Sequence, residues 1–391
     1  MDELVSIIIP CFNQAHFLPS ALKSCLQQTH SNNEIIVIDD GSHDDISAAL
    51  EPFKDRIHLI AQNNLGLSAA RNIGIAHSRG EFIQFLDADD ILGPDTIEAQ
   101  LKFLCENPGI YISVCRNKFF DTIGPSDRPH LTGRWRLYRQ KLDLHLCYFN
   151  IAPPHAFLTR REAIKATGLF DTELRACEDY DYWIRAASQG FVPYPNPSGI
   201  VYYRKHDQSM SADLVNQTKH DAVLHNRLAY ILKENPNFPV GHRLEGLLAF
   251  SAGALSTVKR LIELNLDGSV PLLKLVNESL QQITYLSEEK GFLWNAFTVL
   301  FCLRIDSTLS QLENENIGGQ SKIVRETRKI SDSLNGLNKK KSPFASMIKY
   351  SFKDANDYGL GNKEIFVYLI KYILRQFPFD IPARILEGLS L

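Results

Sequence analysis

The sequence predicts an α/β domain, with a mostly parallel sheet flanked by helices, followed by a mostly α-helical C-terminal domain. Two observations favour this order. Over residues 1–210, short runs of Val, Ile and Phe alternate with stretches that have apolar residues at helical spacing. Over residues 211–391, long helical patterns replace the strand-like runs. Two domains also suit a chain of 391 residues, because domains usually hold about 100–200 residues.

The first domain contains a series of expected strands and two clearly periodic helices. The strand-like runs show little alternation of apolar and polar residues, as expected when helices cover both faces of a parallel sheet. They lie at residues 5–10, 34–39, 57–60, 81–86 and 111–115, and the helical patterns lie at 17–28 and 67–77. Residues 121–145 have no clear period and several arginines, so we expect a long surface excursion there.

The second domain is expected to consist of helices at 221–234, 241–266 and 272–286. Residues 320–341 carry seven Lys and Arg against two Asp and Glu, which is typical of a solvated helix or linker. A further helical pattern at 363–378 is apolar nearly all the way round and also carries basic residues. Peripheral membrane association, core burial and a homodimer contact are the alternatives for this segment.

Charge and cysteine usage exclude several classes of protein. Forty-two Lys and Arg against 45 Asp and Glu give a net charge of −3, so no excess of positive charge indicates a nucleic-acid partner. Seven cysteines are scattered singly, unlike those of a disulfide framework or a zinc ribbon. We see neither a signal peptide nor an apolar stretch long enough to span a bilayer. We therefore expect a cytoplasmic protein, with attachment to the inner face of the plasma membrane left open.

Two clusters of carboxylates follow directly after expected strands. Asp39 and Asp40 end one apolar run, and Asp87, Asp89 and Asp90 follow another. In an open α/β sheet, ligands bind beyond the carboxyl ends of the strands, so both clusters should face one crevice. Because clustered carboxylates repel one another, a divalent cation that holds a phosphate group is the expected occupant. A turn or a helix cap is the alternative for any single one of these residues.

Five motifs stand in the order seen in family 2 glycosyltransferases. They are Val-Ser-Ile-Ile-Ile-Pro10-Cys-Phe-Asn13, Ile-Asp39-Asp40-Gly-Ser42, Asn64-Leu-Gly66-Leu-Ser-Ala-Ala-Arg71-Asn72, Asp87-Ala-Asp89-Asp90 and Glu178-Asp179-Tyr-Asp-Tyr-Trp183. The chain resembles that family over about residues 4–210, roughly half its length. The resemblance implies a GT-A fold, a nucleotide-sugar donor, a Mn²⁺ or Mg²⁺ ion and an inverting transfer of the hexosyltransferase type. The implied acceptor is a glycan or a lipid-linked saccharide, as in cell-surface polysaccharide assembly.

The resemblance assigns four residues to the nucleotide-sugar donor besides the acidic motif. Pro10 and Asn13 correspond to the loop beneath the nucleotide, Asp39 to the residue that contacts the base, and Arg71 to a basic residue that also reaches the nucleotide. A carboxylate at position 39 can accept the N–H of uracil or thymine, which favours a uridine or thymidine nucleotide. A strand end is the alternative for Pro10 and a turn is the alternative for Asn13, while Arg71 could instead be a surface or ion-pairing arginine.

The metal site is expected at the DxD motif formed by Asp87 and Asp89. The resemblance makes Asp89 the direct ligand and gives Asp87 a contact to the metal or to the ribose. Asp90 follows so closely that ligation could be shared. His206 matches a histidine that approaches the metal or the diphosphate, although a surface or capping role is the alternative for a lone histidine.

Transfer needs a base that takes the proton of the acceptor hydroxyl, and Asp179 is our candidate. Asp179 lies at the start of an expected helix, four residues before Trp183, so the two side chains share a face. Glu178 is expected to support the loop or an acceptor hydroxyl. The alternative is that Glu178, Asp179 and Asp181 only compensate the helix dipole.

Other functions have less support in the sequence. A nucleotidyltransferase or a dehydrogenase needs a Gly-rich phosphate loop after the first strand, where this chain has Cys11-Phe-Asn13-Gln-Ala15. A non-catalytic scaffold that binds a partner through its helical domain is the alternative from a different class. The presence of every acid that transfer requires, namely Asp39, Asp87, Asp89 and Asp179, favours the enzyme.

Overall fold

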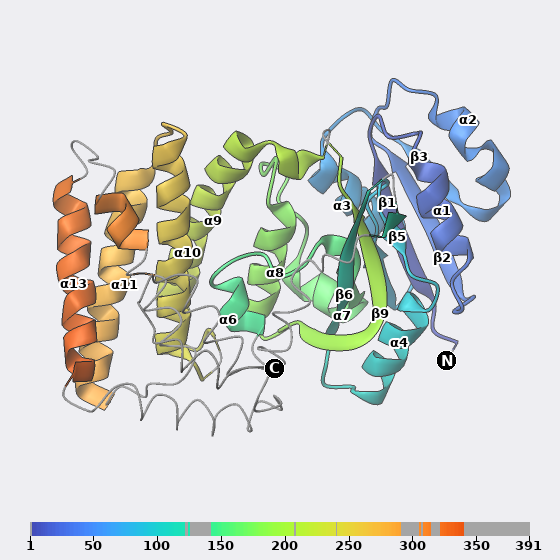
Figure 1. The fold of residues 1–391 in the computed structure, drawn as a ribbon. Helices are drawn as coiled ribbons and strands as arrows, with labels where there is room; N and C mark the ends of the chain where they lie inside the picture. Colours follow the sequence, from blue (N-terminus) through green and yellow to red (C-terminus); the bar gives the residue numbers. More distant parts are fainter. Residues whose placement is uncertain are drawn as a thin grey trace, which may run out of the picture.

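The structure is a computed structural model that describes residues 2–121, 124–125, 142–206, 209–239, 241–290, 305, 308–313 and 321–339. A sheet with its flanking helices forms one half of the molecule, and a set of long helices lies beside it (Figure 1). The expected excursion at 121–145 falls mostly outside the described residues, and the helical pattern at 363–378 falls wholly outside them.

Among the described residues, a nine-stranded sheet forms the centre of the N-terminal half. Its order is β3-β2-β1-β4-β8-β6-β9-β5, and β7 pairs with β6 beside this path. The strands are β1 (Val5–Cys11), β2 (Asn33–Asp39), β3 (His58–Ala61), β4 (Phe82–Phe85), β5 (Ile91–Leu92), β6 (Ile112–Asp121), β7 (Gly124–Pro125), β8 (Phe157–Arg160) and β9 (Tyr194–Arg204).

The expected parallel arrangement is present in the first part of the sheet. Strands β3, β2, β1 and β4 pair in parallel, which places Cys11 opposite Asp39 where β1 and β2 end. Strand β8 then pairs antiparallel with both β4 and β6, so the complete sheet is mixed. The sequence patterns did not indicate β8, which is only four residues long, or β9, which is interrupted by two prolines.

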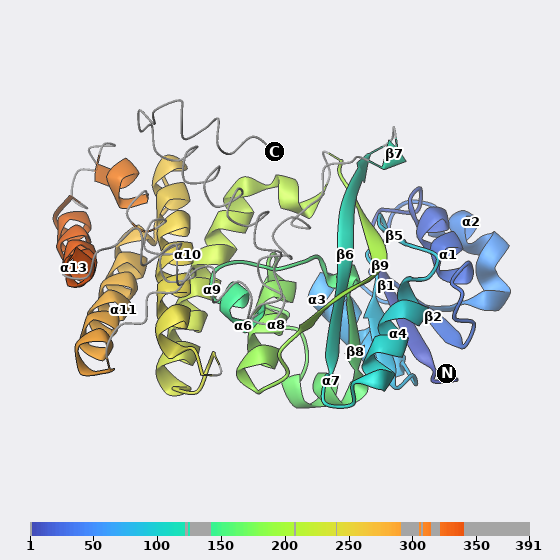
Figure 2. The same ribbon diagram turned by 60° about the horizontal axis from the view of Figure 1, so that its bottom comes forward.

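Helices pack against both sides of this sheet. They are α1 (Leu18–Leu26), α2 (Ile46–Leu50), α3 (Leu67–His77), α4 (Thr96–Glu106), α6 (Leu142–Leu146), α7 (Arg161–Thr167) and α8 (Glu178–Ser188), with short 3₁₀ turns η1 (Glu51–Arg56), η2 (Pro154–Ala156) and η3 (Met210–Ala212). Figures 1 and 2 show α1 and α4 on one side and α3, α7 and α8 on the other. All seven residues of β1 are buried between these layers, which explains its unbroken apolar run.

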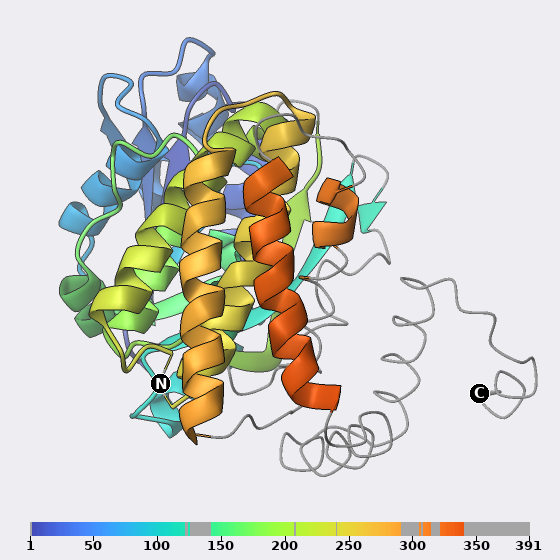
Figure 3. The same cartoon turned by 90° about the vertical axis from the view of Figure 1, so that its left-hand side faces the viewer.

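The C-terminal half consists of long helices in the part of the chain that the structure describes. They are α9 (Leu214–Glu234), α10 (Arg243–Glu263), α11 (Ser269–Lys290) and α13 (Ser321–Lys339). Each packs against the next, and Figure 3 shows α11 and α13 side by side in orange and red-orange. The basic stretch at 320–341 is therefore largely helix α13. No described helix is both long enough and apolar enough to cross a membrane.

The two halves are joined by charged as well as apolar contacts. Arg227 of α9 forms ion pairs with Asp171 at 2.7 Å and with Asp181 of α8 at 3.0 Å. Asp181 also pairs with Arg185 one turn later, at 2.7 Å. A single cluster of buried apolar side chains extends from β1 to α13. The apolar core is continuous across the two halves, so it does not mark a boundary. We therefore propose the division into residues 1–210 and 211–391 from the change in architecture alone.

Candidate functional site

A cavity of about 410 Å³ lies beyond the carboxyl ends of β1 and β4, and we call it the sheet-edge cavity. Its lining brings together residues from several of the predicted motifs, including Pro10, Asp40, Gly66, Asp87 and Asp89. These residues are far apart in the sequence, but parallel strands end at the same edge of a sheet. The predicted meeting of the two acidic clusters is therefore present in the structure.

Asn13 and Asp39 lie next to each other but are not among the residues that line this cavity. The Asn13 side chain accepts from the N–H of His43 at 2.8 Å, and its own N–H donates to the Ser42 hydroxyl at 3.1 Å. Asp39 accepts from the N–H of Ser42 at 2.9 Å. Asn13 also has a φ of 54°, in the left-handed region that asparagine tolerates well. Both residues therefore hold the turn at 42–43.

Asp40 orients the loop that leads into α3. Its carboxylate accepts from the N–H groups of Leu65 and Gly66, each at 2.9 Å. Gly66 has a φ of 95°, and a Cβ at this position would meet the guanidinium of Arg175. The loop therefore requires glycine. Because this loop leads directly into α3, its path determines where α3 begins and where Arg71 of α3 lies.

The structure places Asp89 and His206 in direct contact. The Nε2 atom of His206 lies 2.8 Å from a carboxylate oxygen of Asp89, although 117 residues separate them. Gln14 donates to the same oxygen at 3.4 Å, and Arg204 donates to the backbone carbonyl of Asp89 at 2.7 Å. A carboxylate oxygen beside an imidazole nitrogen is a donor set that suits Mn²⁺. The residues present therefore fit a divalent ion.

Asp90 lies beneath this pair and is almost fully buried. One oxygen lies 2.9 Å from Nδ1 of His155, and the other accepts from the N–H of Arg204 at 2.7 Å. Burial raises the pKa of Asp90 to about 6. Asp87, Asp90 and His155 do present ligand-type atoms within 4.8 Å of one another. Asp90 positions the end of β9, which leads to His206, through the hydrogen bond from Arg204, and its sharing of an ion with Asp87 and Asp89 remains a prediction.

Arg71 is buried, with an exposed fraction of 1%, and it joins the sheet edge to α8. One guanidinium nitrogen donates to Asp87 at 2.7 Å and another to Glu178 at 2.6 Å. Although burial opposes the charge, these carboxylates raise the pKa of Arg71 further. Arg71 is therefore not a surface residue, but the ion-pairing alternative agrees with its two ion pairs, and its guanidinium also lies over the ring of Phe170 at 5.4 Å.

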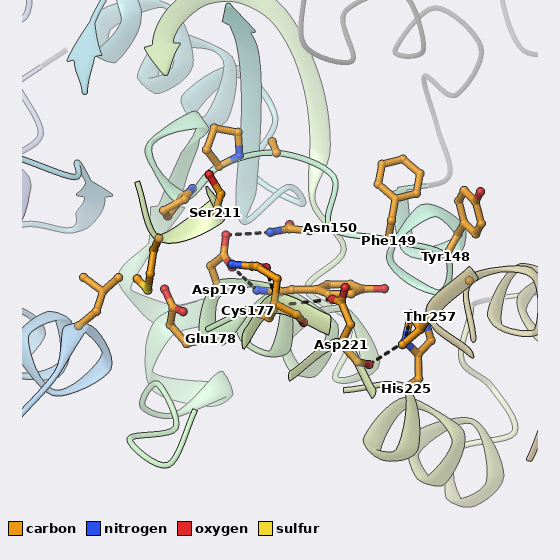
Figure 4. A pocket seen from close by; sticks show the side chains of 18 of the residues that line it. Tyr148, Phe149, Asn150, Cys177, Glu178, Asp179, Ser211, Asp221, His225 and Thr257 are labelled. Carbon is orange, nitrogen blue, oxygen red and sulfur yellow. Dashed lines mark hydrogen bonds between the residues drawn. The ribbon is translucent and has the colours of Figure 1, made fainter. Parts of the chain in front are cut away.

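A second cavity, of about 560 Å³, adjoins the first and lies between the two halves; we call it the junction cavity. Asp87, Glu178 and Tyr203 line both cavities. Asp179 projects from the first turn of α8 into the junction cavity, where Asn150 donates to its carboxylate at 2.8 Å (Figure 4). The candidate base therefore lies next to the candidate donor site.

The environment of Asp179 changes its acidity. Burial and the neighbouring Glu178 carboxylate raise the pKa of Asp179 to about 7, while Arg71 and the hydrogen bond from Asn150 act in the opposite direction. A carboxylate that titrates near neutrality can accept a proton more readily than an ordinary aspartate. Its chemistry thus suits general-base catalysis.

Known proteins resemble the chain in sequence. Residues 6–168 match the family described as Glycosyl transferase family 2. An uncharacterised glycosyltransferase of Rickettsia typhi is 32% identical over 220 residues, which cover 55% of this chain and 68% of that protein. The chain belongs to glycosyltransferase family 2. A 47% identical match to an uncharacterised glycosyltransferase of Rickettsia conorii covers 28% of this chain and only 18% of that longer relative, and the Rickettsia felis match covers 19% of its relative.

Solved structures share the fold of this family 2 glycosyltransferase. Staphylococcus aureus TarS 1–349 in complex with UDP-GlcNAc has a TM-score of 0.57 at 16% identity, covering 85% of this chain and 92% of that one. Mannosyltransferase PcManGT from Pyrobaculum calidifontis, in complex with GDP-Man and Mn²⁺, has a TM-score of 0.51 at 17% identity, covering 86% and 88%. The predicted GT-A class, with its helical C-terminal region, is confirmed.

Sequence reasoning missed the residues that the C-terminal helices of this glycosyltransferase contribute to the junction cavity. They are Gln217, Asp221, His225, Gly253, Ser256, Thr257 and Arg260. Asp221 and His225 are four residues apart and therefore share one face of α9. Two polar residues on one face of an expected helix could have indicated a functional surface. Only the packing of α9 against α8 and α10 shows that this face meets the cavity.

Proposed function

We propose that the protein is a metal-dependent, inverting glycosyltransferase that moves a sugar from a UDP-sugar to a hydroxyl of a glycan or lipid-linked acceptor. The observation that carries this proposal is the pair of adjoining cavities. One is lined by the DxD carboxylates, and the other is lined by a buried carboxylate with a raised pKa. A donor and an acceptor could thus meet at the residues that the two cavities share.

The sheet-edge cavity is our candidate donor site. Asp89 and His206 would hold Mn²⁺ or Mg²⁺, with Asp87 beside them, and a bound ion would supply positive charge that stabilises the leaving diphosphate. Pro10 lines the same cavity, and Asp39 and Asn13 support the adjoining turn. The structural neighbours bind UDP, UDP-GlcNAc or GDP-Man. We favour uridine because Asp39, next to the cavity-lining Asp40, has a second carboxylate oxygen besides the one that accepts from Ser42, and this oxygen could accept the N–H of uracil.

Asp179 is our candidate base on the acceptor side. Its carboxylate takes the proton of the acceptor hydroxyl while the hydroxyl oxygen forms a bond to the anomeric carbon. The bond from that carbon to the diphosphate breaks, and its electron pair leaves on the phosphate oxygen. Attack from the side opposite the diphosphate inverts the anomeric centre. Asn150 and the N–H of Tyr180, each donating at 2.8 Å, orient the Asp179 carboxylate.

The donor site is tested by thermal unfolding. We expect UDP with Mn²⁺ to raise the unfolding temperature of the wild-type chain, because a ligand that binds only the native state stabilises it by about 2.7 kcal/mol at 100 times its dissociation constant. The Asp89→Ala variant should lose this increase, whereas Asp55→Ala, which removes an exposed acid on η1, should keep it. If no nucleotide raises the unfolding temperature with either metal, the non-catalytic scaffold becomes the better explanation.

The pH dependence of transfer tests the base. Because the charged form of Asp179 is the active one, kcat/KM should fall as the pH decreases through about 7. The hydrogen bond from Asn150 favours the charged form, so Asn150→Ala should move this decrease to higher pH. The check is the pH profile of kcat/KM from pH 5 to 9, measured with a UDP-sugar that the enzyme accepts as donor. A decrease that begins only near pH 4 would contradict the assignment.

A further inference from the structure

The junction cavity extends beyond Asp179 to the C-terminal helices, where its lining changes character. Figure 4 shows Asp179 and Asn150 in one part of the cavity, with Asp221, His225 and Thr257 of α9 and α10 further along it. A donor that occupied the sheet-edge cavity would leave this end open. The proposed function places the acceptor hydroxyl at Asp179 and assigns no role to the lining beyond it.

His225 presents an unused hydrogen-bond acceptor in this part of the cavity. Its side chain has an exposed fraction of 3%, and Nδ1 lies 2.7 Å from the backbone carbonyl of Asp221. Since a carbonyl can only accept, Nδ1 carries the proton and Nε2 presents a lone pair. Burial lowers the pKa of His225, which favours this neutral form. Nε2 has no hydrogen-bond partner among the described residues, although buried polar atoms are normally paired.

Gly253 of α10 lines the junction cavity beside this atom. A Cβ at that position would collide with the backbone carbonyl oxygen of Tyr148 and would lie 2.9 Å from Nε2 of His225, so glycine allows the Tyr148 backbone and the His225 ring to lie close to α10. The acceptor atom of His225 therefore belongs to a tightly packed part of the cavity lining and lacks a partner among the described residues, which suits a small donating group such as a hydroxyl.

The charges in the cavity select against an anionic ligand. Arg260 is paired with Asp221 at 2.6 Å, and Arg71 is paired with Asp87 and Glu178. The described lining therefore offers no unpaired cation, while Asp179 adds a further acid. A ligand with phosphate groups would be repelled, whereas a neutral ligand rich in hydroxyls would not.

Two aromatic side chains complete this end of the cavity. Tyr148 and Phe149 both line it, with their rings at 86° and their centroids 5.1 Å apart. Aromatic faces suit the apolar faces of sugar rings. We propose that this end of the junction cavity binds the acceptor as a neutral saccharide, with a sugar hydroxyl donating to Nε2 of His225. This inference rests on the proposed transferase function and names its acceptor class.

The proposal is tested by ligand-observed NMR on the full chain with UDP and Mg²⁺. The neutral probes are maltose, cellobiose, lactose and N,N′-diacetylchitobiose, and the anionic probes are glucose 6-phosphate and glycerol 3-phosphate. At least one neutral disaccharide should bind, and the phosphates should bind more weakly. Binding of the phosphates alone, or of none of the probes, would overturn the proposal.

Variants of His225 locate the binding. His225→Asn keeps a donor near the position of Nδ1 but removes the acceptor, so it should weaken disaccharide binding about five- to tenfold. His220→Asn on the same helix, outside the cavity lining, should have no effect. If His225→Asn does not fold, Ser256→Phe provides a second test, because it adds a ring to the cavity without removing a buried group. Unchanged binding in the folded variant would contradict the assignment.

The failure of this inference can be told apart from failure of the proposed function. Slow hydrolysis of UDP-sugars by the wild-type chain needs only the donor site and water. If the donor is hydrolysed and no neutral saccharide binds, the acceptor assignment alone is wrong. If UDP neither binds nor is released from any UDP-sugar, the transferase proposal itself is wrong.

Discussion

Replacing Asp179 by Asn is expected to reduce the rate of sugar transfer by about 10²–10⁴-fold, the usual contribution of a general base. The amide has nearly the same shape as the carboxylate but cannot take a proton from the acceptor hydroxyl. The residues of the sheet-edge cavity are unchanged, so UDP should bind with its wild-type affinity. Initial rates of transfer and a UDP titration of the same preparation measure the two quantities separately.

Asp181→Asn is the matched control for this variant. Asp181 lies in the same first turn of α8, is also buried, and pairs with Arg185 and Arg227 instead of lining the junction cavity. If the acids of α8 act only by compensating the helix dipole, both variants should have similar effects. A large loss of transfer in Asp179→Asn alone supports the base. Full transfer by Asp179→Asn would remove Asp179 from the mechanism.

Replacing Arg71 by Met is expected to lower the free energy of unfolding by about 3–5 kcal/mol, since removing one partner of a buried ion pair leaves uncompensated charge. Both Asp87 and Glu178 would lose their described cation. Transfer should also fall, because Asp87 would no longer be held beside the DxD partner Asp89. Urea unfolding, followed by circular dichroism, measures the change in stability.

Arg79→Met provides the comparison for the effect of burial. Arg79 also pairs with an acid, Glu34 at 2.9 Å, and its own side chain is 71% exposed although that of Glu34 is 6% exposed. The Glu34 carboxylate would keep hydrogen bonds from the Ser6 hydroxyl and the backbone N–H of Arg79, so losing this exposed guanidinium should reduce stability far less than Arg71→Met. Equal unfolding midpoints for the two variants would show that the Arg71 contacts contribute little.

The residues that sequence reasoning located best are those at the ends of parallel strands. The rule that such ends share one edge was enough to bring the Asp40 and Asp87 segments together, and the structure adds the contact between Asp89 and His206. That contact depends on β9, which leads to His206. Because the prolines of β9 hide its strand character, the short distance between Asp89 and His206 could not be predicted from the sequence. The pairing of β6 with β9 supplies it.

The burial of Arg71 and the contribution of His225 could not be predicted for a related reason. Arg71 is buried because Glu178, 107 residues later, lies against it. His225 faces the cavity because α9 packs on α8 and α10. A helical pattern indicates which residues share a face, but it does not identify the neighbour that the face meets. These parts of the site depend on long-range packing.

The continuous apolar core has a consequence for engineering. Because one cluster includes side chains from β1, α8, α10 and α13, the chain should unfold in one cooperative transition even though its halves differ in architecture. Cutting it near residue 210 would expose the surface of α8 that meets α9. An acceptor preference could therefore not be transplanted by exchanging the helical half alone. The exchanged unit would have to include the α8 surface, because the side chains of α8 and α9 are complementary to each other.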